Sequence, residues 1–582
     1  MQTLDHVILG VYLVGLVGIG VALARRAGRS GEDYFLGGRR IPWWALGASG
    51  MSSNLDVAGT VTIIALLYTY GLQGFWIETR GGVVLPIAVW LAFMGKWHRR
   101  SRVMTTAQWM TLRFGRGAAG RAARYVAAGT YLVITVAMVV FFLTAAARFI
   151  AQFVPAVDPA TAAVLMAAVA LGYTMVSGLH GVVWTDVFQA FLIGAAAVFV
   201  SVKAFAVMGP EVAAAWPGAA TNTAWPQPSL TDETYGSAFW LFLLFFAGKG
   251  LLEGLGGSGG SAYMAQRYYA AASDADTHKL SALWAVLFTF RWPMVTGLAV
   301  LAIHHGVGQD DPETILSTLL LDDAVFPTGL RGLVVAALFA ASMSTFDSTI
   351  NAGASYVVKD LYAPLVHPSV PDEAEVPGEV TAGYVASAVI VALGLVLTLT
   401  LGLGTDILGI WTTIVVGLFP AFLVSFALRW FWGRFNGWGF VAGIVAGFGL
   451  ALLQGFGVLS LNEWQNIAVL AGGSLVVAVL VTLLTPAVPE ARLRGFFEQV
   501  RPWGLWPMGW RAAGAWREEA GDMVRLGVSV VWQVTMFLVP MLLVLREFGQ
   551  AAGTAAIWAV CSAYLFVDVR RQGRREVQEA TP

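Results

Sequence analysis

The stretch ASMSTFDSTINAG, residues 341–353, carries several hydroxyl side chains, an aspartate and an asparagine within an otherwise apolar run. A polar group left in hydrocarbon without a partner costs kilocalories, so each of these side chains needs a neighbour. At about 100° per residue, Ala341, Ser344, Thr345 and Ser348 lie on one stripe of a helix, with Asp347 beside it. Hydroxyl and carbonyl oxygens along such a stripe suit a hard cation such as sodium. The alternative is that the hydroxyls bond back to their own helix.

The composition restricts the class of protein. The 582 residues are 57% hydrophobic and only 12% charged, which is typical of a polytopic membrane protein. The formal net charge is zero, and we expect no nucleic-acid partner. The single cysteine, Cys561, excludes internal disulfides and cysteine metal clusters. No Walker sequence, nucleophile elbow or zinc-protease motif is present, so the sequence predicts neither ATP-driven transport nor an enzyme.

Apolar runs of about 18 residues or more recur along the chain, and they predict an all-α protein with about fifteen transmembrane helices. The N-terminus, MQTLDHVILG, lacks the basic region and cleavage site of a signal peptide, so we expect a retained first helix. The expected spans lie near residues 5–24, 42–70, 80–96, 124–153, 160–177, 183–208, 237–263, 280–305, 330–358, 380–402, 408–430, 437–459, 465–485, 525–546 and 551–569.

The loops between these runs predict the orientation. Three basic loops and the basic tail fall on one side of the membrane if the N-terminus lies outside. The loops assigned to the other side, residues 209–236 and 304–329, contain no lysine or arginine. Because cytoplasmic loops carry the excess of basic residues, we expect a multi-pass protein of the inner (plasma) membrane, with the N-terminus outside and the C-terminus in the cytoplasm.

Two of the expected spans contain glycines and polar groups in their middle. The second contains GASGMSSNLDVAGT and the seventh contains AGKGLLEGLGGSGGSA. Unwound backbone at membrane depth is tolerated only where it lines a cavity enclosed by protein. A pair of interrupted spans five apart predicts an inverted-repeat transporter whose site lies at the breaks. The alternative is that the glycines only let helices pack closely.

Four stretches carry a resemblance to a known family: EDYFLGGRRIPWWALGASGMSS, GLHGVVWTDVFQAFL, YMAQRYYAAASDADTHK and AASMSTFDSTINAGASYVVKDLY. In order and spacing they resemble the sodium:solute symporters, which carry sugars, amino acids and carboxylates, over about residues 5–485. The resemblance implies a five-plus-five inverted-repeat, LeuT-type core with one extra N-terminal helix and several extra C-terminal helices. We therefore expect an extra helix and cytoplasmic loop over 1–41, the core over 42–430, additional transmembrane helices over 431–485, a cytoplasmic interfacial linker over 486–524, and two helices with a basic tail over 525–582.

The resemblance also implies ion sites. It places a sodium ion between carbonyls at the first-helix break and the polar stripe, with the expected ligands Ala48, Met51, Ala341, Ser344 and Thr345. Some family members hold a second sodium near the fifth-helix aspartate, and the corresponding group here is Asp186, Asp347 and Ser348. Two carboxylates close together in low dielectric repel, so this group predicts either a second cation or a proton site. The alternative is that Asp347 pairs with a base or with Asn351.

Ionisable and polar residues within the expected spans are candidates for solute binding. Arg80 falls where the sugar carriers of the family have an acidic group, and Gly257 falls where they have an aromatic gate. Because basic side chains match a carboxylate, we favour an organic acid or amino acid over a neutral sugar. Asp56 either bonds an amine of the solute or pairs with Lys249. The candidates are Asn54, Asp56, Arg80, Lys249, Glu253 and Gly257.

The sequence thus predicts a secondary symporter that couples import of a small polar solute to sodium by alternating access. The remaining hypotheses are a sodium/sugar symporter, a proton-coupled transporter, and a membrane nutrient sensor with the same fold. A sensor of that type has a large signalling domain after its spans, whereas only RRQGRREVQEATP follows here. The expected partners are a small-molecule solute and the lipid bilayer, and the sequence leaves the oligomeric state open.

Overall fold

The computed structural model describes residues 1–27, 30–81, 84–154, 156–216, 239–256, 262–371, 374–511 and 515–580. This part of the chain is helical and contains no strand. Its first half comprises α1 (Thr3–Ala27), α2 (Gly31–Leu36), η1 (Gly37–Arg39), α3 (Trp43–Ser52), α4 (Val57–Tyr70), α5 (Gln73–Glu78), α6 (Val84–Val89), η2 (Trp90–Met94), α7 (Gly95–Ser101), α8 (Gln108–Phe114), α9 (Ala118–Phe153), α10 (Pro159–Val207) and α11 (Pro210–Ala214).

The second half continues the same all-α architecture. It comprises α12 (Phe239–Gly256), α13 (Ala262–Tyr269), α14 (Asp274–Phe288), α15 (Arg291–His305), η3 (Pro312–Thr314), α16 (Ile315–Leu321), α17 (Leu330–Tyr356), η4 (Val357–Tyr362), α18 (Ala363–Val366), α19 (Glu379–Thr400), η5 (Gly402–Gly404), α20 (Ile407–Thr412), η6 (Thr413–Leu418), α21 (Pro420–Phe431), α22 (Gly437–Gly455), α23 (Glu463–Leu484), α24 (Glu490–Val500), η7 (Met508–Trp510), α25 (Ala515–Val544) and α26 (Phe548–Ala580).

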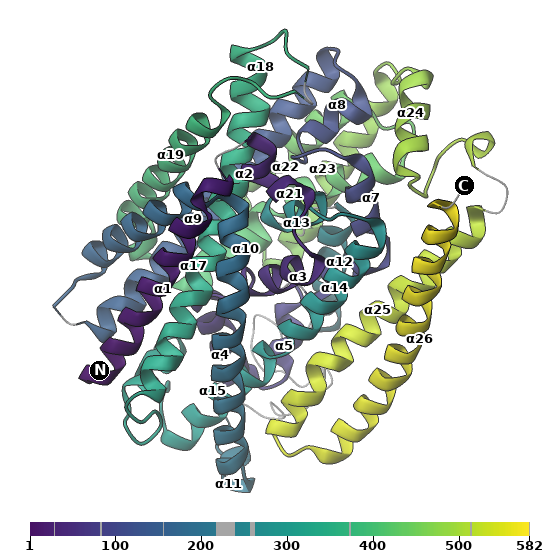
Figure 1. Ribbon diagram of the computed structural model, residues 1–582. Coiled ribbons are helices and arrows are strands. Elements are labelled where there is room, and N and C mark those ends of the chain that lie inside the picture. Colours follow the sequence, from purple (N-terminus) through teal and green to yellow (C-terminus); the bar gives the residue numbers. More distant parts are fainter. Residues whose placement is uncertain are drawn as a thin grey trace.

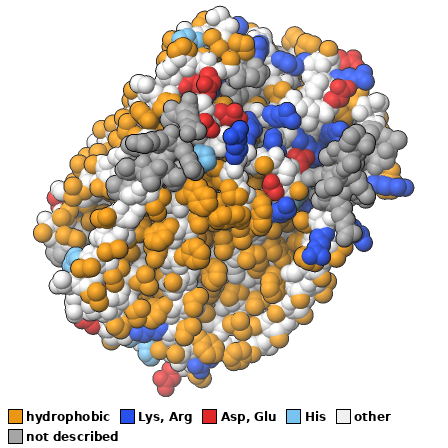
Figure 2. Space-filling view, viewed as in Figure 1, with side chains coloured by type: hydrophobic (Ala, Val, Ile, Leu, Met, Phe, Trp, Pro, Cys, Tyr) orange, Lys and Arg blue, Asp and Glu red, His pale blue; other side chains and the backbone are white. Residues whose placement is uncertain are grey.

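The helices agree with a protein that spans a membrane. Within the described ranges, nine helices are long and apolar enough to cross a bilayer, or eleven if each strongly bent pair counts as one span. The expected count of about fifteen therefore remains a prediction. Figure 2 shows a broad apolar surface across the middle of the molecule, with most of the visible charged side chains gathered toward one end. In Figure 1 the two termini lie toward opposite ends of the helical bundle.

The expected interruption of the second span is present. α3 and α4 are separated by residues 53–56 and meet at an angle of 61°. In the seventh span, α12 ends at Gly256 and α13 begins at Ala262, and the glycine run between them lies outside the described residues. A further bend, of 43°, lies between η6 and α21 and was not predicted.

α10 shows why one helical stretch corresponds to two expected spans. A straight α-helix of its 49 residues would measure about 70 Å, more than twice the hydrocarbon thickness of a bilayer. Gly178 divides it, with φ 52° and ψ −166°, a conformation that glycine adopts without a Cβ clash. The bend lies between the expected spans 160–177 and 183–208, so this boundary is placed by a single glycine.

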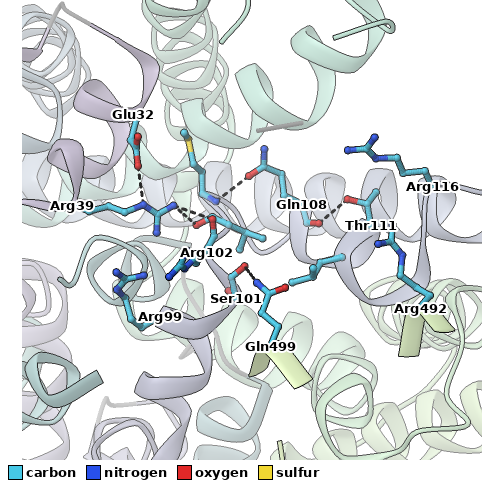
Figure 3. A pocket seen from close by; sticks show the side chains of 13 residues that line it. Glu32, Arg39, Arg99, Ser101, Arg102, Gln108, Thr111, Arg116, Arg492 and Gln499 are labelled. Carbon is cyan, nitrogen blue, oxygen red and sulfur yellow. Dashed lines mark hydrogen bonds and ion pairs between the residues drawn. The ribbon is translucent and has the colours of Figure 1, made fainter. Parts of the chain in front are cut away.

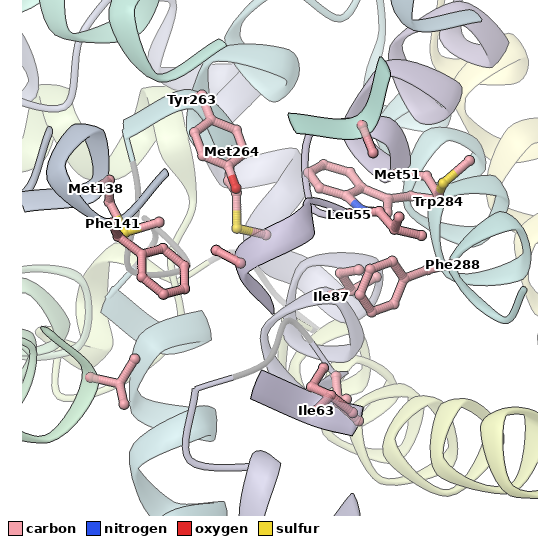
Figure 4. Close-up of a cluster of buried hydrophobic side chains, with 14 of the residues drawn as sticks. Met51, Leu55, Ile63, Ile87, Met138, Phe141, Tyr263, Met264, Trp284 and Phe288 are labelled. Carbon is pink, nitrogen blue, oxygen red and sulfur yellow. The ribbon is translucent and has the colours of Figure 1, made fainter. Parts of the chain in front are cut away.

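The first helix break lies within the apolar core. Figure 4 shows Met51 and Leu55 beside Trp284 and Phe288 of α14, with Tyr263 and Met264 of α13 nearby. A Cβ on Gly50 would lie 2.2 Å from the Trp284 ring, so α14 can pack this closely only against a glycine. α3 is therefore fixed by packing on one face, which leaves its polar face for the site.

The C-terminal elements lie outside the central bundle. α25 and α26 form a helical hairpin at one edge of the molecule (Figure 1). α24, within the expected linker 486–524, packs on α7 and α8 and buries Leu493, Phe496, Phe497 and Val500. This amphipathic helix contributes to a polar cavity described below.

Candidate functional site

Local hydrogen bonds fix the backbone at the break between α3 and α4. The Asn54 amide donates to the Met51 carbonyl at 3.0 Å, which closes a tight turn at the end of α3. The Asp56 side chain caps α4 by accepting from the Gly59 amide at 2.6 Å, as aspartate commonly does at an N-cap. Ser342 of α17 accepts from the Val57 amide at 3.0 Å. The start of α4 is therefore attached to α17.

The expected sodium ligands on α17 are buried and adjacent. The Thr345 hydroxyl donates to the Ala341 carbonyl at 3.0 Å, which is the back-bonding that the sequence analysis gave as the alternative. Ser344 behaves differently, because its hydroxyl donates to Asp186 of α10 at 2.5 Å. One of the two hydroxyls thus bonds to its own helix and the other bonds across helices.

Asp186 connects three helices at this point. Its carboxylate, fully buried on α10, accepts from Ser49 of α3 and Ser344 of α17, each at 2.5 Å. Its backbone carbonyl accepts from Ser52 at 2.9 Å. Ser53, at the end of α3, lies within hydrogen-bonding distance of Ser348, with 2.8 Å between the two oxygens. The face of α3 with its serines therefore meets the polar stripe of α17 around one carboxylate.

Arg267 of α13 enters the same cluster, and the sequence analysis did not identify it as a site residue. Its Nη2 donates to Ser49 at 3.0 Å, to Ser53 at 2.8 Å and to Ser348 at 2.5 Å. It also lies 3.6 Å from the Asp186 carboxylate. A fully buried aspartate needs a positively charged partner. The presence of Asp186 within an apolar span was therefore the sequence signal that a basic side chain lies beside it. The guanidinium thus provides a positive charge where a second cation was expected.

Asp347 has a different neighbourhood from Asp186. The Thr174 hydroxyl of α10 lies 2.5 Å from an Asp347 carboxylate oxygen and 2.6 Å from the Ala170 carbonyl. Asn351 accepts from the side chain of Gln266 at 2.8 Å. The Thr174 hydroxyl has one proton and two acceptors within reach. If Asp347 carried a proton, it could donate to the Thr174 oxygen while the Thr174 hydroxyl donates to the Ala170 carbonyl, so both contacts would be hydrogen bonds. The contact is compatible with a charged Asp347 that accepts from Thr174 and with a protonated one, so the proton alternative stays a prediction.

The solute side of the break is bonded to α13 and α15. The Asn54 side chain donates to the Tyr263 hydroxyl at 2.6 Å, and the backbone carbonyl of Asn54 accepts from Arg291 at 2.7 Å. Arg291 also interacts electrostatically with Asp56. The suggested pairing of Asp56 with Lys249 is wrong, because Lys249 forms its ion pair with Glu253 within α12. Asp56 instead interacts with Arg291, which was not among the predicted solute-binding residues.

Arg80 is also matched by an acid. It forms an ion pair with Glu463 of α23, and its guanidinium lies 5.6 Å from the ring of Phe246. Lys249 lies 4.7 Å from the ring centre of Phe419. Three of the expected solute residues, Arg80, Lys249 and Glu253, are thus buried in ion pairs. Gly257 lies outside the described residues.

Two polar side chains of α5, Gln73 and Glu78, have buried atoms that lack partners in the described part of the chain. Gln73 is fully buried, and neither its amide nitrogen nor its amide oxygen has a hydrogen-bond partner in the described part of the chain. The Glu78 Oε2 atom is likewise unpartnered there, and Glu78 interacts electrostatically with Arg80, Arg291 and Lys249. Buried polar atoms are rarely left unsatisfied, so these atoms are candidate contacts for a bound solute. Gln73 was missed because a lone glutamine gives no motif.

An ionic contact lies beyond the break, at the opposite end of the bundle from α24. Arg148 of α9 approaches Glu313 of η3 at 3.7 Å and donates to the Thr405 carbonyl at 2.8 Å. Glu313 accepts from the Leu408 amide at 2.8 Å, at the start of α20. A cavity of about 70 Å³ lies between these residues and the Val57 end of α4. A path from this end of the molecule to the break could widen only if these contacts of Glu313 were broken.

Comparison with known proteins agrees with this architecture. The sodium/sialic acid symporter NanT of Aliivibrio fischeri is 25% identical over 378 residues, which cover 62% of this chain and 70% of that protein. The sodium/glucose cotransporter of Vibrio parahaemolyticus is 25% identical over 524 residues, covering 83% and 91% respectively. The human sodium/iodide cotransporter is 27% identical over 471 residues, covering 78% and 70%.

Solved structures show the same fold. A substrate-bound, outward-open Na⁺-coupled sialic acid symporter superposes with a TM-score of 0.66 at 22% identity, covering 84% of this chain and 99% of that chain. Mhp1, a nucleobase-cation-symport-1 family transporter, gives a TM-score of 0.51 at 13% identity, covering 80% and 97%. The inverted-repeat, LeuT-type fold that the family resemblance implied, and with which the broken spans agree, is confirmed.

The family model described as the sodium:solute symporter family matches residues 34–447, which is more than two thirds of the chain. This range contains the broken α3–α4 pair, the polar stripe of α17 and the Asp186 cluster. The chain therefore belongs to the sodium:solute symporter family, and sodium is its coupling ion.

Proposed function

We propose that this protein imports an amino acid or another small organic carboxylate together with sodium, by alternating access. The observation that carries the proposal is the group of buried charges beside the first helix break, where Glu78 interacts with Arg80, Arg291 and Lys249. A neutral sugar has no need of so many charges, whereas a carboxylate binds guanidinium and ammonium groups well.

The pairing of these charges favours a zwitterion within that class. Each of the three bases already has an acid, namely Glu463 for Arg80, Glu253 for Lys249 and Asp56 for Arg291. A simple anion would take a base from its acid and leave that acid buried without a partner, which is costly. An amino acid brings both signs, so its carboxylate can bind a base while its ammonium binds the unpartnered oxygen of Glu78. Gln73 supplies neutral hydrogen bonds beside them.

We assign sodium to the carbonyls of Ala48, Met51 and Ala341 and the hydroxyls of Ser344 and Thr345. Ala341 and Thr345 support this assignment because their two oxygens lie 3.0 Å apart, so one ion can contact both. Such an ion would join α17 to the break, next to the solute. If sodium favours solute binding in this way, linkage requires the solute to raise the affinity for sodium by the same factor.

A second cation at Asp186, Asp347 and Ser348 is a separate proposal with a condition attached. Arg267 already contacts Ser348 and lies close to Asp186. Two cations cannot share this space in low dielectric, so a second sodium requires Arg267 to withdraw. With Arg267 in place, we expect a single sodium ion per solute.

The function is tested by uptake into proteoliposomes. A panel of radiolabelled amino acids, carboxylates and sugars is offered with an inward sodium gradient, and again with potassium replacing sodium. We expect accumulation of an amino acid or carboxylate only with the sodium gradient. Sodium-driven uptake of glucose or galactose that no carboxylate competes with would refute the assignment of substrate class. Equal uptake with a proton gradient alone would favour proton coupling.

The orientation in the membrane is part of the proposal. We place the end with α7, α8 and α24 in the cytoplasm, together with the C-terminal tail, and the N-terminus outside. The arginines near α7 and α24 support this placement through the positive-inside rule. Accessibility of the tail to a protease added outside sealed right-side-out vesicles is the test, and cleavage there would contradict this placement.

A further inference from the structure

A polar cavity of about 900 Å³ lies at the end of the molecule where α7, α8 and α24 meet (Figure 3). Its walls come from three separate parts of the sequence: α2 with η1, the stretch from the end of α7 through α8 to Arg116, and α24. Gln499 of α24 donates to the carbonyls of Arg100 and Ser101, which fixes α24 against the end of α7. The cavity is therefore built from several elements that are packed against one another.

The lining of this cavity is strongly basic. It contains five arginines and a single acidic residue, Glu32; the arginines are Arg39, Arg99, Arg102, Arg116 and Arg492. Glu32 is already engaged, because Arg39 Nε donates to it at 2.8 Å. The nearby Asp274 is ion-paired with Arg100 at 2.6 Å, outside the lining. Beyond the pair of Arg39 with Glu32, Arg99, Arg102 and Arg492 have no acidic partner among the described lining residues.

Two of these arginines make no internal contact that explains their position. The side chains of Arg102 and Arg492 form no hydrogen bond or ion pair with any residue that the structure describes. Arg102 ends α7 with a positive φ of 53°, a position where glycine is favoured and arginine is strained. The chain therefore keeps a strained arginine at the rim of the cavity without using its guanidinium internally.

The arginine side chains that line the cavity also repel one another electrostatically. Burial, with Arg39 and Arg102 beside it, lowers the pKa of the Arg99 guanidinium from its usual value. Its Nε atom is buried without a hydrogen-bond partner in the described ranges. An anion in the cavity would relieve this repulsion and accept from the unpartnered donors. The positive-inside rule explains why basic residues occur at this end, but not why they converge on one cavity.

We propose that this cavity binds an anion that carries phosphate, either the headgroup of an anionic phospholipid or a soluble compound with more than one phosphate. Guanidinium groups match phosphate oxygens with paired hydrogen bonds, which carboxamides and hydroxyls cannot do. The volume lies in the range of ligand pockets, about 300–1,000 Å³, and exceeds what a single orthophosphate fills. Because the walls come from three stretches of sequence, an occupant ties η1, α7, α8 and α24 together and stabilises the fold.

The test uses the purified full-length protein in detergent. Its affinity for potassium pyrophosphate and for dioctanoyl phosphatidylglycerol is measured by calorimetry and by the shift in unfolding temperature, at constant sodium and ionic strength. Potassium sulfate and dioctanoyl phosphatidylcholine are the reference ligands. We expect at least one phosphate probe to bind and to raise the unfolding temperature. Binding of pyrophosphate alone identifies a soluble ligand, and binding of phosphatidylglycerol alone identifies a lipid.

The variant Arg102→Gln with Arg492→Gln removes two guanidinium groups without breaking an internal bond. We expect it to weaken binding by about tenfold or more, while its unfolding temperature without ligand matches the wild type. Arg494→Gln is the matched control, because Arg494 lies on the same helix but pairs with Glu498 away from the cavity. The proposal is overturned if neither phosphate probe binds the wild type more tightly than its reference, or if the double variant binds as tightly as the wild type.

Discussion

The two sides of the first helix break use different chemistry. On the ion side, α3, α10 and α17 meet through serine and threonine hydroxyls around one carboxylate, Asp186, and one guanidinium, Arg267. On the solute side, α12, α15 and α23 bring together ion pairs such as Lys249 with Glu253. Both sides are buried, and both contact the break, the ion side through Ser53 and the solute side through the contact of Arg291 with Asn54.

This difference indicates how each side can respond to a ligand. A hydroxyl can exchange a hydrogen-bond partner for a cation without leaving a buried charge behind. An ion pair cannot open in the same way, because separating it leaves two buried charges that need new partners. The ion side is therefore suited to a small cation that binds and dissociates reversibly. The solute side is suited to a ligand that supplies charges of its own.

The largest effect is expected from Asp186→Asn. This change leaves Arg267 buried without a counter-charge, and breaking such a pair typically costs about 3–5 kcal/mol of folding stability. We expect a large fall in the unfolding temperature and loss of uptake. The double variant Asp186→Asn with Arg267→Gln removes both charges and should recover most of the stability. Equal stability of the single variant and the wild type would show that the cluster is not a charge pair.

Removal of single hydroxyls should weaken sodium binding. We expect Ser344→Ala and Thr345→Ala each to raise the half-saturating sodium concentration by roughly tenfold, because a lost ligand oxygen is not easily replaced in a dry site. Sodium dependence of uptake is the measurement. Thr349→Ala is the control, since Thr349 lies one turn along the same helix and only donates to the Thr345 carbonyl. Unchanged sodium dependence in both variants would remove these residues from the site.

The unpartnered groups on α5 should affect the solute. We expect Gln73→Leu and Glu78→Gln to raise the half-saturating solute concentration by about 5- to 30-fold, the effect of losing one or two buried hydrogen bonds. Sodium binding measured without solute should not change. Gln454→Leu, on α22, serves as a control for the loss of a glutamine in a membrane helix. A shift in sodium affinity without solute would show that the two sides of the break are not separate.

The smallest effect is expected at Asp347. If the transporting form carries a proton on Asp347, uptake should fall as the pH rises and that proton is lost. Asp347→Asn keeps the neutral form and should give a flatter pH profile, with a change of a few-fold at alkaline pH. Thr174→Val tests the same contact from the other side. An unchanged pH profile and sodium Hill coefficient in Asp347→Asn would leave this residue with a structural role.

Much of the fold was predictable because it depends on local composition. Apolar runs long enough to cross a bilayer, and glycine with polar residues in the middle of such a run, are properties of short stretches. They predicted the broken second span, which the structure confirms as α3 and α4. The third bend, between η6 and α21, falls at Gly417 and Pro420 within an apolar run. Proline in such a run predicts a kink, and this signal was overlooked.

The sequence alone determined which residues are costly in a membrane, but only the tertiary structure decided how they are paired. Asp186, Arg80, Lys249 and Asp56 were recognisable as charges within apolar spans. Their partners are Arg267, Glu463, Glu253 and Arg291, and three of these four come from other helices. A local pattern predicts a pair only when it lies within a turn or two of one helix, as for Lys249 and Glu253. Long-range pairs depend on how helices pack, and packing is a property of the whole chain.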